Sequence, residues 1–162
     1  MREFSISAGG VTVVGATTMI AVNPPAAPNP NIEFLRYWIG QSANATSAQQ
    51  RVELATKASV FPTLTSATPV KLKPSDPNAS VITGGTAGAQ GTAGTNASAE
   101  GAGTQTIVWD DAFNVLNGWL HVPTPAETRV MPAGFAGSLE LYFPVTPGTT
   151  TNWAFGLIYR EV

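Results

Sequence analysis

The chain has 162 residues, and its eight Lys or Arg, ten Asp or Glu and one His give a formal net charge of −2 at pH 7. This length fits one domain, and the scattered basic residues argue against a nucleic-acid partner, because phosphate binding requires clustered Lys and Arg. Charged residues make up only 11% of the chain, against about 25% in an average soluble domain, so we expect a surface largely covered by protein partners.

Cysteine is absent, so the chain can form neither disulfides nor thiolate metal sites. Near the N-terminus, Glu3, Ser5 and Ser7 interrupt the layout that a signal peptide would have. No apolar run approaches the roughly 18 residues of a membrane-spanning helix. We therefore expect no export and no membrane partner.

Apolar and polar residues alternate with period two along most of the chain, and helical periodicity is almost absent. In chain order, strands are predicted at Glu3–Ser7, Val11–Val14, Thr18–Val22, Asn31–Gln41, Gln50–Val60, Thr104–Trp109, Trp119–Val122, Thr128–Met131, Ser138–Phe143 and Trp153–Glu161. Pro and Gly punctuate the segments between them. This pattern predicts an all-β fold, an antiparallel β-sandwich of the jelly-roll type.

Three segments give more specific predictions. Asn31–Gln41 has apolar side chains on both faces, so we expect it to be covered on both sides. Trp153–Glu161 places its aromatic and aliphatic residues on one continuous face. A short helical turn is predicted at Asp110–Leu116.

Two segments are predicted to lie outside a regular sandwich. Residues 1–30 are expected to form an N-terminal strand or arm that ends in a Pro-rich link, Asn23–Pro30, and residues 31–162 the β-sandwich domain. That domain contains a Gly/Ala/Thr-rich insertion at residues 83–103.

The insertion Thr83–Gly103 has seven glycines and no aromatic or large aliphatic side chain, so in isolation it should behave as a flexible linker. Ordering its backbone costs about 1–2 kcal/mol per residue. Either its own sheet or a neighbouring subunit must therefore supply contacts. An extended arm that adds to a sheet edge, in this chain or in a neighbour, is favoured over a long loop.

Motifs for catalysis are nearly absent. Gly84–Gly94 is glycine-rich but lacks the Gly-Lys-Ser/Thr ending of a phosphate-binding loop, and no Gly-x-Ser-x-Gly nucleophile motif occurs. His121 is the single histidine, so a multi-histidine metal site is impossible. We predict a hydrogen-bonded structural role for it.

Asp110 and Asp111 are the strongest candidates for chemistry. Paired carboxylates can hold a hard cation such as Ca²⁺, or hydrolyse a glycosidic bond with a partner about 5–9 Å away. The possible partners are Glu100, Glu127 and Glu140. The pair follows a predicted strand, however, where Asp frequently caps the next turn. We favour the cap, and predict no catalytic, cofactor-binding or metal-binding residues.

The four tryptophans raise the possibility of a carbohydrate-binding platform. Trp38, Trp109, Trp119 and Trp153 would form one if at least two were exposed and coplanar on one face. Each lies in a predicted strand with an apolar-rich pattern. Packing in the core or at a subunit interface is therefore the prediction.

Several short segments resemble small β-rich proteins encoded among the structural genes of tailed phages. The resemblance covers roughly Ile32 to the C-terminus and rests on structural motifs. They are Gly40-Gln41-Ser42, Gln50-Arg51-Val52-Glu53-Leu54, Asp111-Ala112-Phe113-Asn114-Val115, Gly118-Trp119, Pro123-Thr124-Pro125, Glu127 and Leu157-Ile158-Tyr159-Arg160-Glu161-Val162.

The resemblance implies a virion component without enzymatic activity, and a capsid decoration (cement) protein suits the low charge best. Such a protein is made in the host cytoplasm, binds the outside of the phage head as a dimer or trimer, and bridges major capsid protein subunits. The expected contact segments are Met1–Ser7, Asn23–Asn31 and Thr83–Gly103, because none has enough apolar mass to order itself. The alternatives are a head–tail connector, a tail or fibre component, a carbohydrate-binding module and, least favoured, a glycosidase.

Overall fold

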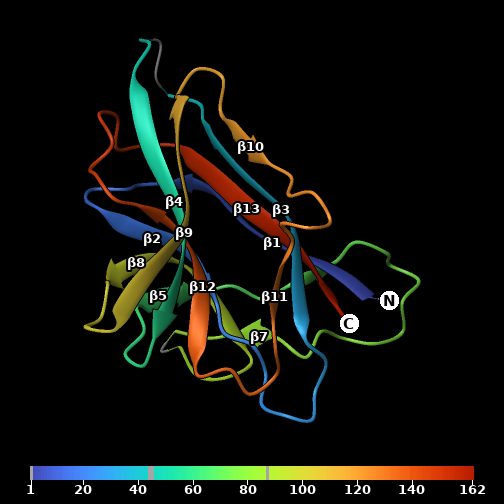
Figure 1. The fold of residues 1–162 in the computed structure, drawn as a ribbon. Coiled ribbons are helices and arrows are strands. Elements are labelled where there is room, and N and C mark those ends of the chain that lie inside the picture. The colour runs from blue at the N-terminus through green and yellow to red at the C-terminus, as the bar shows by residue number, and fades with distance from the viewer. Residues whose placement is uncertain (1, 44–45, 87) are drawn as a thin grey trace.

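The computed structural model describes residues 2–43, 46–86 and 88–162, so Met1 and Ala87, which belong to two expected contact segments, lie outside the described residues. The described residues form thirteen strands in two sheets that pack face to face (Figure 1). None of these residues forms a helix, so no described segment is a helix that could span a bilayer. The expected all-β, antiparallel sandwich is confirmed.

Sheet A has the strand order β10-β3-β13-β1-β6, and β11 also pairs with β3. All its pairs are antiparallel, and Arg2 lies opposite Glu161, which places the two ends of the described chain side by side (Figure 1). The strands are β1 (Arg2–Val11), β3 (Ile32–Gln41), β6 (Val70–Lys71), β10 (Trp119–His121), β11 (Arg129–Met131) and β13 (Trp153–Glu161).

Sheet B has the strand order β5-β8-β2-β12-β4-β9, and β7 also pairs with β8, in parallel. The strands are β2 (Thr17–Val22), β4 (Gln49–Ala58), β5 (Thr63–Ser66), β7 (Thr83–Gly84), β8 (Thr92–Ala99), β9 (Thr104–Asn114) and β12 (Gly137–Phe143).

Eight of the strands carry the jelly-roll topology that the sequence predicted. The four-stranded units are β1-β13-β3-β10 in sheet A and β2-β12-β4-β9 in sheet B. The chain crosses between the sheets from β1 to β2, β2 to β3, β3 to β4, β9 to β10, β11 to β12, and β12 to β13. These crossings produce the two Greek keys of a jelly roll. The strands β5 to β8 are an insertion between β4 and β9 that widens both sheets at one side.

The core lies between the sheets and is rich in aromatic side chains. Phe113 and Phe143 of sheet B pack against Trp153 of sheet A, with ring centroids 6.4 Å and 5.0 Å from the tryptophan. Further along sheet A, Phe4 stacks on Tyr159 at 5.6 Å. The expected apolar face of β13 is confirmed, since its odd-numbered residues from 153 to 159 are all buried.

The N-terminal segment is an integral part of the sandwich and not an arm. Strand β1 lies between β13 and β6, and its Phe4 and Ile6 side chains are buried in the core. The Pro-rich link is also held by its own chain, because the Asn23 amide donates to the Thr92 carbonyl and the Gly91 amide to the Pro24 carbonyl. The expectation that these segments require a partner to become ordered is therefore corrected.

The Gly/Ala/Thr-rich insertion adds strands to a sheet edge of this same chain. Strand β8 pairs with β2 on one side and β5 on the other, and Ala93 and Thr95 are buried there. The lack of side chains permits close packing, since a Cβ atom on Gly94 would lie 2.5 Å from the Leu64 Cβ atom. Of the two sources considered from the sequence, the chain's own sheet therefore supplies the contacts, through backbone pairing and close approach and not through apolar mass.

Two local predictions are wrong. A β-bulge opposite the Ile158–Tyr159 step of β13 shifts the buried side of β3 from Ile32 and Phe34 to Tyr37 and Ile39. The outer face of β3 is consequently only partly covered. The helical turn expected at Asp110–Leu116 is also absent, because β9 continues to Asn114, where Phe113 reaches the core.

We expect Gly94→Ala to lower the free energy of unfolding by about 1–3 kcal/mol, because the added methyl group forces β8 away from β5. The measurement is urea unfolding followed by tryptophan fluorescence. Gly9→Ala in β1 is the matched control, since a Cβ atom there meets nothing within 4 Å. Equal stability of the two variants would contradict the described packing of β8.

Candidate functional site

The outer face of sheet A exposes apolar side chains from several strands. The strand register shows which outward side chains are neighbours: Leu120 lies beside Trp38, and Ile158 lies between Arg36 and Ser5. Leu120 is 64% exposed and Val130 is 50% exposed. We refer to Trp38, Leu120, Val130, Ile158, Val70 and Leu72 as the apolar face of sheet A.

Trp38 has a definite place on this face. Its indole ring lies over Gly156 of β13, where a Cβ atom would come within 2.0 Å of the ring. Leu120 and Ile158 join Trp38 and Arg36 in lining a shallow groove. At one end of the face, Arg160 makes a bidentate ion pair with Glu33. Arg36 adds an exposed charge beside Ile158, so the face combines apolar side chains with one exposed cation and one ion pair.

A second feature is a pocket of about 350 Å³ where the edges of the two sheets meet. Trp109 of β9 and His121 of β10 form its walls, Tyr37 of β3 lies beside His121, and the loop before β11 supplies Glu127. Arg129, the first residue of β11, also lines it. The volume falls within the range of about 300–1,000 Å³ typical of small-molecule sites.

The aromatic rings around this pocket form a continuous group centred on His121. Its imidazole lies 4.8 Å from the Trp109 ring, 5.7 Å from Trp119 and 5.8 Å from Tyr37. Burial lowers the pKa of His121, with Glu127 and Asp111 acting in the opposite direction, so the imidazole is neutral at pH 7. Ring packing holds this histidine in place. The hydrogen bond predicted for its side chain is not found among the described residues.

The Tyr37 hydroxyl is a buried polar group with no hydrogen-bond partner among the described residues. The side chain is 1% exposed, and burial raises the pKa of Tyr37 far above its usual range, while the nearby Arg129 charge opposes that rise. Leaving a buried hydroxyl unpaired typically costs about 1–3 kcal/mol. Such a group is uncommon in folded proteins and marks this pocket.

The two charged groups at the pocket differ in how they are paired. The Glu127 carboxylate accepts hydrogen bonds from the Thr124 hydroxyl at 2.8 Å and the Thr124 amide at 3.1 Å, and these bonds lower its pKa. Arg129 is exposed and forms no ion pair with another described residue. The guanidinium is therefore the available charge at this site.

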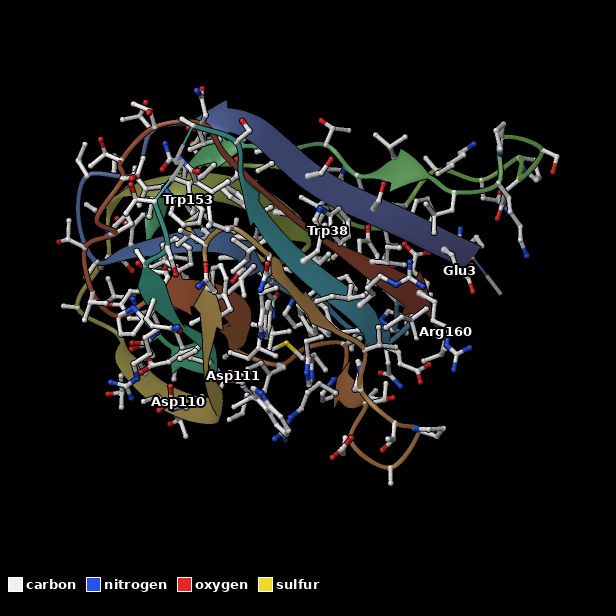
Figure 2. The ribbon with its side chains drawn as sticks, turned by 90° about the horizontal axis from the view of Figure 1, so that it is seen from above. Glu3, Trp38, Asp110, Asp111, Trp153 and Arg160 are labelled. Carbon is white, nitrogen blue, oxygen red and sulfur yellow. The ribbon has the colours of Figure 1, made fainter. Side chains whose placement is uncertain are left out.

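Asp110 and Asp111 lie within β9 and do not cap a turn, so that prediction is wrong. Asp110 makes a bidentate ion pair with Arg51 of β4, at 2.8 Å and 2.6 Å, and this pairing lowers the pKa of Asp110. Asp111 accepts a hydrogen bond from the Trp119 indole at 3.0 Å. Both lie at the opposite end of the molecule from Glu3 and Arg160 (Figure 2).

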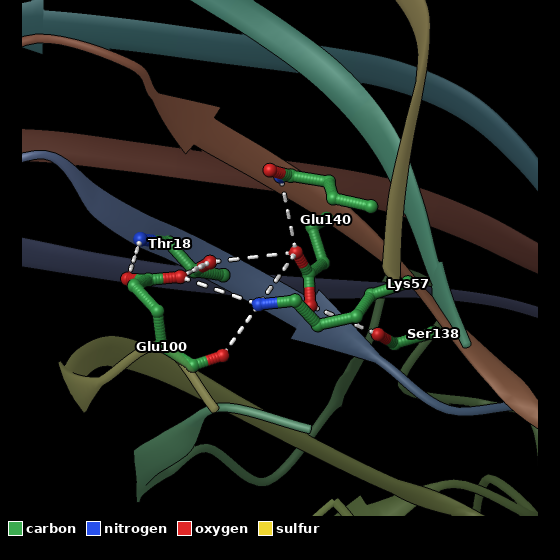
Figure 3. Close-up of polar contacts among 6 residues, drawn as sticks. Thr18, Lys57, Glu100, Ser138 and Glu140 are labelled. Carbon is green, nitrogen blue, oxygen red and sulfur yellow. Dashed lines mark hydrogen bonds and ion pairs between the residues drawn. The ribbon is translucent and has the colours of Figure 1, made fainter. Parts of the chain in front are cut away.

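The buried polar cluster on the outer face of sheet B was not predicted from the sequence. Lys57 of β4 lies 3.9 Å from the Glu140 carboxylate of β12, and Glu140 also accepts hydrogen bonds from Ser138 at 3.0 Å and Gln105 at 3.4 Å (Figure 3). Glu140 is fully buried. Neighbouring strands bring these residues together, and nothing in their sequence spacing indicates it.

Glu100, one of the suggested partners of Asp110 and Asp111, completes this cluster from the loop after β8. Its carboxylate accepts hydrogen bonds from the Thr18 amide and hydroxyl, both at 2.6 Å, and its backbone carbonyl accepts one from Lys57 (Figure 3). These contacts fasten the end of the Gly-rich insertion onto sheet B. Glu100 and Glu140 thus come together, but at a structural lock and away from Asp110.

The tryptophans do not form one exposed platform. Trp119 and Trp153 are buried, Trp38 lies on the outer face of sheet A, and Trp109 lines the pocket between the sheets. Within the described chain, no three His, Asp or Glu side chains are grouped as a metal site. Comparison with protein-family models, curated proteins and solved structures gives no match to this chain.

The pKa of Glu140 predicts a pH-dependent stability. Burial raises this pKa to about 7 from 4.5, against the opposing effects of Lys57, Ser138 and Thr18. Between these values the folded state binds more protons than the unfolded state, so the free energy of unfolding falls as pH rises from about 4.5 to 7. The decline is up to about 3 kcal/mol.

We expect Glu140→Gln to remove this decline in urea unfolding measured across that pH range, because the amide does not titrate. Glu127→Gln is the control, since the exposed Glu127 has a lowered pKa and should leave the slope unchanged. Parallel curves for the wild type and Glu140→Gln would contradict the assignment.

Proposed function

We propose that this protein is a phage virion structural protein, a capsid decoration protein that binds the outside of the head and stabilises contacts between major capsid subunits. The observation that carries the proposal is the apolar face of sheet A. Contiguous exposed apolar surface is uncommon on monomeric soluble proteins and generally marks an interaction site. The resemblance of several short segments to phage structural proteins, noted from the sequence, suggests the kind of partner.

The contrast between the two outer faces supports sheet A as the docking side. Sheet B covers its outer face with its own loop, which Glu100 fastens over Lys57 and Glu140. Sheet A has no such cover over Leu120 and Val130, which remain half or more exposed. Docking this face onto a capsid shell would remove apolar surface from water, at about 25 cal/mol per Å².

Few charges surround this face, which suits permanent attachment better than rapid exchange. The Glu33–Arg160 pair satisfies itself within the chain, so docking leaves neither of these two charges unpaired, whereas Arg36 beside Ile158 would require an acceptor on the shell. Association as a homodimer or homotrimer would present several copies of the face at once. Linked weak contacts then give firm binding to a symmetric shell.

The contact segments expected from the sequence are replaced in this proposal. The sequence predicts contacts at Met1–Ser7, Asn23–Asn31 and Thr83–Gly103 because these segments have little apolar mass. Their described residues are, however, held by pairing within the chain. The apolar face of sheet A now takes the role of contact surface. A head–tail connector or tail component remains the alternative within the virion.

We expect Leu120→Lys to weaken binding to heads assembled without this protein by at least about tenfold, because docking would bury an unpaired charge. Co-sedimentation of labelled protein with such heads gives the occupancy. Leu120 is 64% exposed, so the substitution should leave stability unchanged. Val14→Lys, in the loop between β1 and β2, is the matched control at another exposed aliphatic residue.

Unchanged binding of Leu120→Lys would overturn the docking face. Imaging of the decorated heads separates the alternatives within the virion. Decoration predicts many copies over the whole shell, whereas a connector or fibre would appear as a few symmetry-related copies at one vertex.

A further inference from the structure

The pocket between the sheet edges has no part in the proposed docking face and requires its own explanation. It lies between β9 and β10, whereas the apolar face lies on the outer side of sheet A. It combines an exposed aromatic ring, a neutral imidazole, and a buried hydroxyl and a guanidinium that find no partner in the described part of the chain. In a purely structural region, buried polar groups are normally hydrogen-bonded within the protein, so these polar groups around one pocket indicate a ligand site.

We propose that this pocket binds a carbohydrate through an acidic sugar residue, with Trp109 under the sugar ring and Arg129 on its carboxylate. The inference does not depend on the role of the protein in a virion.

Trp109 supplies the apolar part of the recognition. It is 39% exposed, although Leu54, the residue opposite it on β4, is buried. Its other side is supported by His121 at 4.8 Å, so the ring is held in place before a ligand arrives. A rigid, half-exposed indole offers a flat surface on which the C–H face of a sugar ring can stack.

Arg129 supplies the charge and favours a carboxylate. Its guanidinium has no ion-pair partner among the described residues, and arginine binds carboxylates through two parallel hydrogen bonds. A phosphate fits less well, because Glu127 lies at the same pocket and its lowered pKa keeps it ionised. A singly charged ligand meets less repulsion there than a doubly charged one.

Tyr37 and His121 supply neutral hydrogen-bonding groups at the floor and wall. The Tyr37 hydroxyl lacks a partner within the described chain, and His121 remains neutral at pH 7. Neutral donors and acceptors of this kind suit sugar hydroxyl groups. A ligand oxygen at the floor would give the buried Tyr37 hydroxyl the partner that the described residues do not supply.

The test uses the purified full chain, glucuronic acid as probe and glucose as its uncharged counterpart. The indole N–H signals in ¹H–¹⁵N NMR spectra report on each tryptophan separately. Glucuronic acid should shift the Trp109 signal, while Trp153, whose indole donates to the Thr149 carbonyl in the core, should not move. Absence of a Trp109 shift, or equal affinity for glucose, would overturn the proposal.

Three variants sharpen the test. Arg129→Gln should weaken glucuronic acid binding by about tenfold or more and remove the preference over glucose, whereas Arg36→Gln on the outer face of sheet A should change neither. Tyr37→Phe should weaken binding without loss of stability, because it deletes an unpaired hydroxyl. Wild-type affinity in Arg129→Gln or Tyr37→Phe would overturn the assigned contacts.

Discussion

The contact of Phe113 and Phe143 with Trp153 is the interaction on which the rest of this structure depends. It joins β9 and β12 of sheet B to β13 of sheet A, and every other feature is arranged around the two sheets that it holds together. With no cysteine in the chain, such packing replaces the disulfides that stabilise many small β-domains. Large aromatic side chains bury much apolar area at low entropic cost, which suits a sandwich of this size.

The two outer faces of the sandwich differ because their strands carry different residues outward. Sheet B points Lys57 and Glu140 outward and covers them with a loop, since a buried charge must be paired. Sheet A points Leu120, Ile158 and Trp38 outward, with Leu120 largely exposed and the other two partly exposed. This asymmetry, and not any catalytic constellation, is why we assign a binding role to the protein.

The sequence was sufficient for the fold class and for most of the long strands, because period-two alternation is a local signal. It missed the short strands β5, β6 and β7, and the separate strand expected at Val11–Val14 is absent because β1 ends at Val11. The Trp153–Glu161 strand was predicted with its full length and its buried face. It was not sufficient where tertiary pairing overrides the local pattern: the bulge in β3 changes which side of the strand is buried, and β8 owes its order to β2 and β5. The residues of the pocket and of the Lys57 cluster come from strands distant in the chain, so no spacing rule could reveal them. The suggestion of a tryptophan platform failed for the same reason, although it did include Trp109.

The antiparallel pairing of β1 with β13 has a practical consequence. Because Arg2 lies opposite Glu161, a peptide or reporter domain joined to either extremity would emerge from one corner of the sandwich, remote from Asp110 and Asp111 (Figure 2). Two different cargoes, one on each extremity, would be held as close neighbours. The same proximity makes the chain suitable for circular permutation, in which a short linker closes the original ends and new ones open in a surface turn.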